Sequence, residues 1–194
     1  MSFLSRLKLY IQITGGGEIA RRYFVMNGFD GILTVFGIVL GAFLVGYESA
    51  KEIIVPGIGA TFAIGISGFW IAFLTEQAEQ ELEKKKIEKS IFTNLDDTLF
   101  SKAARVVSFI NSFVDGFSPF MFGFLVLSPF FLVQFGFLTI QMAYVTSFIL
   151  TFLLLFILGF FLGRIAKQNW LIFGLKTSMA GIVLGLLMVI TGIE

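Results

Sequence analysis

The residues best suited to chemistry are two aspartates that lie inside long apolar stretches of the sequence. Asp30 lies in the apolar stretch 23–46, and Asp115 lies in the stretch 106–133. An ionised aspartate at the centre of a bilayer costs roughly 2.5–3.5 kcal/mol on insertion scales, and such residues mark ion pathways and proton relays. Asn27 and Asn111 precede them by about one helical turn. Carboxylate and amide oxygens together are suitable ligands for Mn²⁺ or Fe²⁺, so the four residues form a predicted cation site.

Four further ionisable residues bear on this site. Lys176 lies in the apolar stretch 170–193, where it could pair with Asp30 or Asp115. The alternatives are a structural ion pair or a lysine that extends to the interface, and an amine that occupies an empty cation site and is displaced by the ion. Glu76, Glu79 and Glu83 recur at helical spacing after the second apolar stretch. They form either a solvated helix face or a row of carboxylates that collects metal cations.

The composition excludes several classes of chemistry. The chain has no cysteine and no histidine, which removes disulfides, thiolate sites and every scheme with a histidine base. Gly65-Ile66-Ser67-Gly68 matches part of an intramembrane protease motif, but that serine needs a histidine. No nucleotide-binding loop or metalloprotease motif occurs. We therefore expect no enzyme, no tightly bound cofactor and no nucleic-acid partner.

Five apolar stretches are long enough to cross a bilayer as helices. Hydrophobic residues make up 57% of the 194 residues and charged residues only 14%, which is far from the composition of a soluble domain. About 20 apolar helical residues span the hydrocarbon core, and the stretches 23–46, 53–75, 106–133, 137–163 and 170–193 meet that length. The sequence predicts an all-α polytopic membrane protein with five transmembrane helices.

The basic residues predict the orientation of these helices. Twelve of the fourteen lysines and arginines lie before the first stretch, between the second and third, or between the fourth and fifth. Because cytoplasmic loops retain positive charge, we expect the amino terminus inside and the carboxyl terminus outside. The organisation is then an amphipathic surface segment 1–22, spans in 23–75, a charged cytoplasmic helix and linker 76–105, and spans in 106–194.

Two glycine pairs of the G-x-x-x-G type suggest an oligomer. Gly37 and Gly41 lie in the first span, and Gly181 and Gly185 lie in the fifth. Small residues at this spacing allow close contacts between membrane helices, and five helices are few for enclosing a pathway. We therefore expect a homodimer embedded in a lipid bilayer, with the cell membrane as the expected location.

The sequence resembles the vacuolar iron transporter family. Residues 21–37 carry a basic pair, Arg21-Arg22, followed by Asp30-Gly31-Ile32-Leu33-Thr34, similar to an element of that family's first span. Residues 159–194 resemble its last two spans. The resemblance implies a dimer that moves Fe²⁺ or Mn²⁺ out of the cytosol in exchange for protons, with Asp30 as a ligand in the translocation site.

The same resemblance implies that Glu76, Glu79 and Glu83 are what remains of the family's glutamate-rich metal-binding domain in a divergent prokaryotic-type member. The stretch 53–74 lacks the methionine and glutamate of the family's second span. Our hypothesis is an exporter of a divalent metal in which Asp30 and Asp115 bind the metal or a proton and Asn27 and Asn111 assist. The alternatives are a membrane scaffold or lipid-interacting protein, and a transporter of another small solute.

Overall fold

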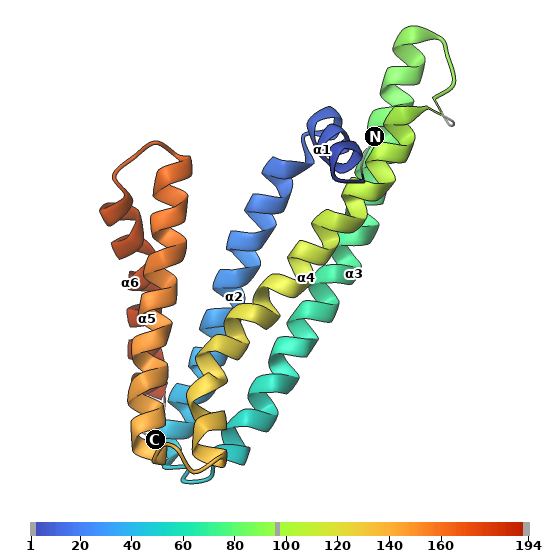
Figure 1. The fold of residues 1–194 in the computed structure, drawn as a ribbon. Helices are drawn as coiled ribbons and strands as arrows, with labels where there is room; N and C mark the ends of the chain where they lie inside the picture. Colours follow the sequence, from blue (N-terminus) through green and yellow to red (C-terminus); the bar gives the residue numbers. More distant parts are fainter. Residues whose placement is uncertain (1–2, 96–97, 192–194) are drawn as a thin grey trace. The chain divides into compact units, whose positions relative to one another are not determined.

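The structure is a computed structural model that describes residues 3–95 and 98–191, and the regular elements in these ranges are helices (Figure 1). They are α1 (Phe3–Thr14), α2 (Gly16–Val45), α3 (Ala50–Ile91), α4 (Leu99–Gln134), α5 (Ile140–Ile165) and α6 (Trp170–Thr191). Helices α2 to α6 are each long and apolar enough to cross a membrane. The predicted fold class, all-α with five transmembrane helices, is confirmed.

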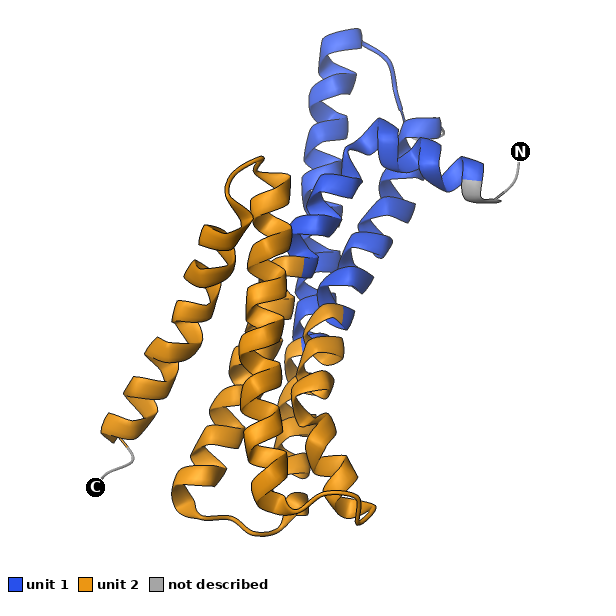
Figure 2. Ribbon diagram, turned by 60° about the vertical axis from the view of Figure 1, so that its left-hand side comes forward, with its two compact units in different colours: residues 1–24, 65–117 blue, residues 25–64, 118–194 orange. Residues whose placement is uncertain are grey.

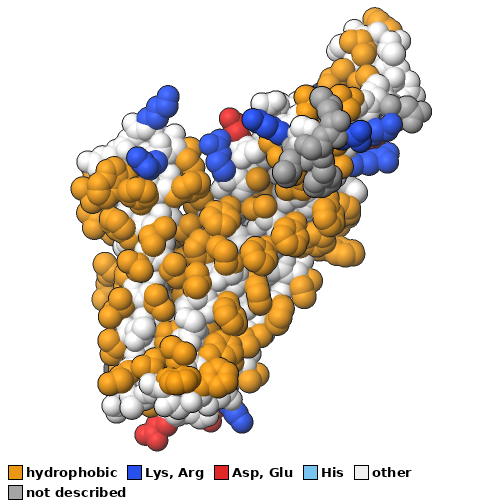
Figure 3. Space-filling model, in the orientation of Figure 1, with side chains coloured by type: hydrophobic (Ala, Val, Ile, Leu, Met, Phe, Trp, Pro, Cys, Tyr) orange, Lys and Arg blue, Asp and Glu red, His pale blue; other side chains and the backbone are white. Residues whose placement is uncertain are grey.

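The helices form because lipid offers no partner for a backbone N–H or C=O, so each spanning segment must satisfy these groups internally. Their lipid-facing surface is correspondingly apolar. Hydrophobic side chains cover most of the helical surface that is visible in the space-filling view (Figure 3). Exposed apolar residues such as Ile66, Leu175 and Ile190 lie on spanning helices and are 62–69% accessible in the single chain. Such exposure is stable only where lipid covers it.

Several helix boundaries differ from the predicted spans. Helix α1 ends at Thr14, as expected, because Gly15 adopts a positive φ of 67°, which glycine tolerates without strain. Helix α2 then begins at Gly16 and not at residue 23. Helix α5 begins at Ile140, because the Thr139 side chain accepts a hydrogen bond from the Met142 N–H and caps the helix there.

The charged segment after the second span is largely helical. Helix α3 continues without interruption from Ala50 to Ile91, and α4 begins at Leu99, before its apolar portion. Both helices therefore extend beyond the length that lipid requires. Ion pairs at helical spacing lie on the extension of α3, such as Lys85 to Glu81 at 3.7 Å between Nζ and Oε1. These pairs suit a segment in water more than one in hydrocarbon.

The chain divides into two compact units (Figure 2). Unit 1 comprises residues 1–24 and 65–117, and unit 2 comprises residues 25–64 and 118–194. Helices α2, α3 and α4 each contribute to both units. Asp115 belongs to unit 1, whereas Asp30 and Lys176 belong to unit 2.

Glycines bring the helices of unit 2 into close contact. A Cβ added at Gly31 on α2 would collide with the backbone of Pro119 on α4, with Cα at 2.6 Å and carbonyl carbon at 2.8 Å. A Cβ at Gly57 on α3 would lie 2.7 Å from a methyl group of Leu127 on α4. Small residues thus let three helix backbones approach one another, as in other membrane helix contacts.

Buried hydrogen bonds between helices add to this packing. The Ser147 hydroxyl on α5 donates to the Val126 carbonyl on α4 at 2.8 Å between oxygens. The Thr177 hydroxyl on α6 donates to the Leu155 carbonyl on α5 at 2.8 Å. Such bonds between membrane helices contribute on average about 0.6 kcal/mol each. They fix the register of α5 against its neighbours on both sides.

The glycine pairs that suggested a dimer contact residues of their own chain. A Cβ at Gly37 or Gly41 would meet Leu184 at 3.8 Å or Met188 at 3.3 Å, both on α6. One at Gly181 would meet Leu155 on α5 at 3.0 Å. These faces are therefore occupied within unit 2 and give no support to a homodimer, which stays a prediction.

We predict that Gly31→Ala destabilises the protein by about 1–3 kcal/mol, because the new methyl group meets backbone atoms of Pro119 that cannot rotate away. The measurement is the midpoint of unfolding in detergent. Gly59→Ala on α3 is the matched control, since a Cβ there has nothing within 4 Å. Equal midpoints for both variants would contradict the close α2–α4 contact.

Candidate ion-binding site

Asp115 is seated against a glycine of the neighbouring helix in unit 1. Its carboxyl oxygen Oδ2 lies 2.7 Å from where a Cβ of Gly68 would be, so the acid occupies the space that a larger residue on α3 would fill. One residue further along α4, a Cβ at Gly116 would lie 2.5 Å from the Gly65 carbonyl oxygen. The backbones of α3 and α4 are therefore close at this level. Asp115 is 5% exposed.

A row of buried polar residues on α4 leads to Asp115. Its members lie at helical spacing and are at most 7% exposed: Ser101, Ser108, Asn111, Ser112 and Asp115. The Ser112 hydroxyl donates to the Ser108 carbonyl at 2.7 Å, as is common for serine in membrane helices. The amide nitrogen of Asn111 is buried and has no hydrogen-bond partner. A buried donor without a partner is costly, and a bound water or ligand oxygen would satisfy it.

Glu76 belongs to the same buried region. It is 2% exposed, and its Oε1 accepts a hydrogen bond of 3.0 Å from the Tyr23 hydroxyl on α2. Asp115 also lies within electrostatic range of that hydroxyl. Tyr23 thus connects the environments of two buried acids. Tyr23 was not among the predicted site residues, and nothing in its sequence context distinguishes it from an ordinary interfacial tyrosine.

Of the predicted ligands, Glu76, Asn111 and Asp115 come together in unit 1, whereas Glu79 and Glu83 do not join them. The last two are exposed on the surface of α3. Glu79 and Glu83 recur at helical spacing with Glu76 but do not lie on the buried face of α3. That face runs through Ala72 and Glu76 and is covered by α4 and α2. Across residues 3–95 and 98–191, no three or more acidic side chains are grouped closely enough to hold a metal by themselves.

Asp30 and Asn27 lie in unit 2. Asp30 is at the middle of α2 and is exposed in the single chain, whereas Asn27 is half-buried. Asp30 precedes Gly37 by seven residues, so both lie on one face of α2, and Gly37 contacts α6. An exposed acid on a spanning helix needs water, a cation or another polar group beside it.

Lys176 does not form the predicted ion pair with Asp30. Its Nζ lies 5.6 Å from the centre of the Phe173 ring on its own helix, and its side chain is exposed. No carboxylate within the described part of unit 2 pairs with it. This geometry is that of a lysine extending towards the interface from an apolar helix.

Gly68 belongs to the candidate site, although it was not among the predicted site residues. The sequence motif at 65–68 points to its neighbour Ser67. Ser67 is exposed, whereas Gly68 faces Asp115 across the helix contact. No local sequence signal reports this contact, because Gly68 and Asp115 are 47 positions apart.

We predict that the thiol of Asp30→Cys reacts quickly with a polar maleimide in membranes. The chain has no cysteine, so the engineered thiol is the sole target. Thiols react as thiolates, which need water, and an acid on a spanning helix indicates water at that face. Leu186→Cys, at a position 59% exposed on α6, is the control for a lipid-facing site and should react at least about tenfold more slowly. Equally slow reaction at both positions would place Asp30 out of contact with water.

Comparison with known proteins identifies one archaeal relative. The chain is 34% identical over 177 residues to the "Uncharacterized protein MJ0645" of Methanocaldococcus jannaschii, and the match covers 90% of this chain and 89% of the relative. No protein-family model matches the chain, and no solved structure matches it. Since the match spans nearly the full length of both proteins, this chain belongs to the same family as that archaeal protein.

Proposed function

We propose that this protein is a secondary transporter that exports a divalent metal, Fe²⁺ or Mn²⁺, from the cytosol in exchange for protons. In this proposal the amino terminus is cytoplasmic and the protein lies in the cell membrane. Asp115 is the principal carrier residue, Asn111 and Glu76 assist it, and Asp30 is a second acid used along the pathway.

The observation that carries the proposal is the burial of Asp115 within a row of buried polar residues on α4. The side chain is 5% exposed and lies in a spanning helix. Serine and asparagine side chains continue from it along α4 within unit 1. A helix that needed only to pack would carry apolar residues there, since each polar group that is removed from water costs free energy. A polar row that contains an acid provides oxygens that a hydrated ion or a proton requires.

The chemistry of these groups supports exchange of a cation for a proton. A carboxylate that loses a bound cation in a low-dielectric site becomes costly unless it takes up a proton. The Tyr23 hydroxyl is already hydrogen-bonded to Glu76, so a donor stands beside one of the two acids. Binding of the metal and binding of the proton would therefore compete for the same oxygens.

The choice of metal rests on the ligand types and on the resemblance of residues 21–37 to the vacuolar iron transporter family. Carboxylate and amide oxygens suit Mn²⁺ and Fe²⁺, and the side chains of Asp115, Glu76 and Asn111 carry such oxygens. Asp30 lies in the motif that carries the resemblance. Its exposure leaves its carboxylate accessible in the single chain.

We expect Asp115→Asn to lower the rate of Fe²⁺ and Mn²⁺ transport by about 10-fold to 100-fold, because interactions with a charged group contribute about 1.5–3 kcal/mol. The assay uses proteoliposomes that contain a metal-sensitive dye. Glu79→Gln, an exposed acid on α3, is the matched control and should retain the wild-type rate.

Gly68→Ala provides a second test that keeps the carboxylate. The added methyl group would meet the end of the Asp115 side chain at 2.7 Å, and this side chain can move aside. Transport should therefore fall while the unfolding midpoint stays close to that of wild type. Wild-type transport rates in both Asp115→Asn and Gly68→Ala would refute the role of Asp115.

A membrane scaffold is the second candidate, and the Tyr23–Glu76 hydrogen bond favours it. This bond joins α2 to α3 within unit 1 and would stabilise the fold without any ion. In a scaffold, Asp115→Asn would change the unfolding midpoint, and calorimetry would detect no binding of Mn²⁺ to the wild-type protein.

A further inference from the structure

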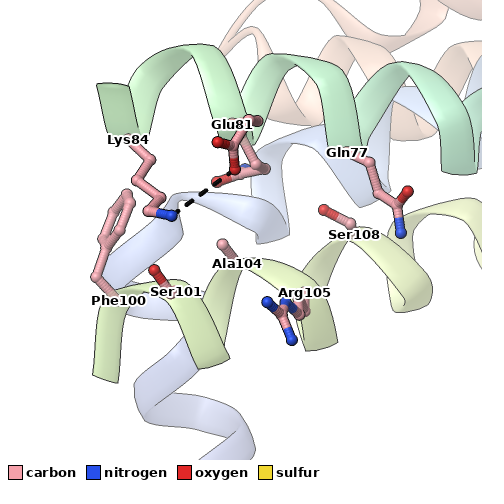
Figure 4. A pocket seen from close by; sticks show the side chains of 9 residues that line it. Gln77, Glu81, Lys84, Phe100, Ser101, Ala104, Arg105 and Ser108 are labelled. Carbon is pink, nitrogen blue, oxygen red and sulfur yellow. Dashed lines mark ion pairs between the residues drawn. The ribbon is translucent and has the colours of Figure 1, made fainter. Parts of the chain in front are cut away.

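The extensions of α3 and α4 in unit 1 enclose a cavity, which Ser101 and Ser108 of the buried polar row help to line. Its volume is about 330 Å³, which is within the range of small-ligand sites. Gln77, Gln80 and Lys84 line it from α3, and Phe100, Arg105 and Ser108 line it from α4 (Figure 4). In the close view the Lys84 and Gln77 side chains project from α3 towards α4.

The cavity lies at the level of lipid headgroups. On α3 its lining begins at Gln77, directly after the apolar span, and ends at Lys84. At 1.5 Å per residue these eight residues cover about 12 Å. The headgroup region on each side of a bilayer is about 5–8 Å thick. The first half of the cavity therefore lies beside lipid phosphates and not in open cytosol.

Two oxygens in its wall lack hydrogen-bond partners. They are the amide oxygen Oε1 of Gln80 and the hydroxyl oxygen of Ser108, and both are buried. Ser108 is 1% exposed. Buried polar atoms in native proteins are nearly always paired, so each indicates a missing partner. The hydroxyl of Ser108 can donate, whereas Oε1 of Gln80 can only accept.

Of the two basic side chains that line the cavity, Lys84 is paired with carboxylates and Arg105 is available to bind an anion. The Nζ of Lys84 lies 3.9 Å from carboxylate oxygens of both Glu81 and Glu88. Arg105 is exposed, and among the described residues no carboxylate pairs with it. A guanidinium group binds a phosphate through two parallel hydrogen bonds that the opposite charges strengthen. A neutral ligand lacks the negative charge for this. The cavity thus favours an anionic group near Arg105 and Ser108.

We propose that this cavity binds a phosphate group that carries a hydrogen-bond donor, as in a phosphatidylglycerol or phosphatidylethanolamine headgroup. Arg105 and the Ser108 hydroxyl hold the phosphate, and Gln80 accepts from the hydroxyl or ammonium group of the headgroup. A choline headgroup has no such donor and leaves Gln80 unpaired. A bound lipid would hold the extensions of α3 and α4 at the membrane surface. This role does not depend on whether the protein transports a metal.

Lipid retention on the full-length protein tests this proposal. The detergent-purified protein is incubated separately with phosphatidylglycerol, phosphatidylethanolamine and phosphatidylcholine, and bound lipid is counted by native mass spectrometry. We expect the first two to be retained at least about fivefold better than phosphatidylcholine, since Gln80 gains a partner only from them. Glycerol phosphate, which has the same polar groups without the acyl chains, tests a soluble ligand.

Three variants test whether these lipids are retained at the cavity. Arg105→Gln should lower retention of phosphatidylglycerol about tenfold, because a charge-assisted bond to phosphate is lost. Gln80→Leu should abolish the preference by lowering retention of phosphatidylglycerol to about that of phosphatidylcholine, because the bond to the headgroup donor is lost. Lys102→Gln, an exposed position on α4 that does not line the cavity, should behave as wild type.

Two results would overturn the proposal. One is equal retention of all three lipids by the wild-type protein, and the other is the same retention by the Arg105 and Lys102 variants. If glycerol phosphate binds and phosphatidylglycerol is not retained, the lipid is not the ligand, and the assignment passes to a soluble phosphate compound. Each readout is independent of metal transport, so failure here leaves the transport proposal unaffected.

Discussion

The cost of holding a carboxylate out of water is the constraint on which the candidate site depends. Asp115 and Glu76 are almost fully buried in the single chain, and both lie in unit 1. The structure meets part of that cost by surrounding them with a tyrosine hydroxyl, an asparagine and serines. The amide nitrogen of Asn111 stays unpaired. The site is therefore polar, and one of its hydrogen-bond donors is available to an acceptor such as a water oxygen.

Glycine determines where such a site can exist. Gly68 leaves space for the Asp115 carboxylate, and Gly116 brings α4 close to the backbone of α3. In unit 2, Gly57 instead faces an apolar side chain, and Gly31 faces backbone atoms of the neighbouring helix. The same residue type thus has two uses in one chain. The difference is whether the neighbouring helix presents a polar or an apolar side chain to the vacant space.

The extension of α3 beyond the bilayer gives the protein a second polar region. Its inner residues, such as Gln80 and Lys84, line a cavity with α4, whereas its outer residues are exposed. Glu79 and Glu83 belong to the outer set. A continuous helix explains both roles, because one face of a helix can be covered while the opposite face is solvated.

The sequence by itself determined the number of spanning helices, because a run of about 20 apolar residues must be helical in lipid. It singled out Asp30 and Asp115 alike, and only the structure shows that Asp115 is buried whereas Asp30 is exposed in the single chain. Only the tertiary structure decided which polar groups meet. Tyr23 and Glu76 are 53 residues apart, and Gly68 and Asp115 are 47 apart, so no local pattern reports these contacts. The same holds for Lys176, whose helix face was set by the packing of α6 against α5 and α2 and not by its apolar neighbours in sequence.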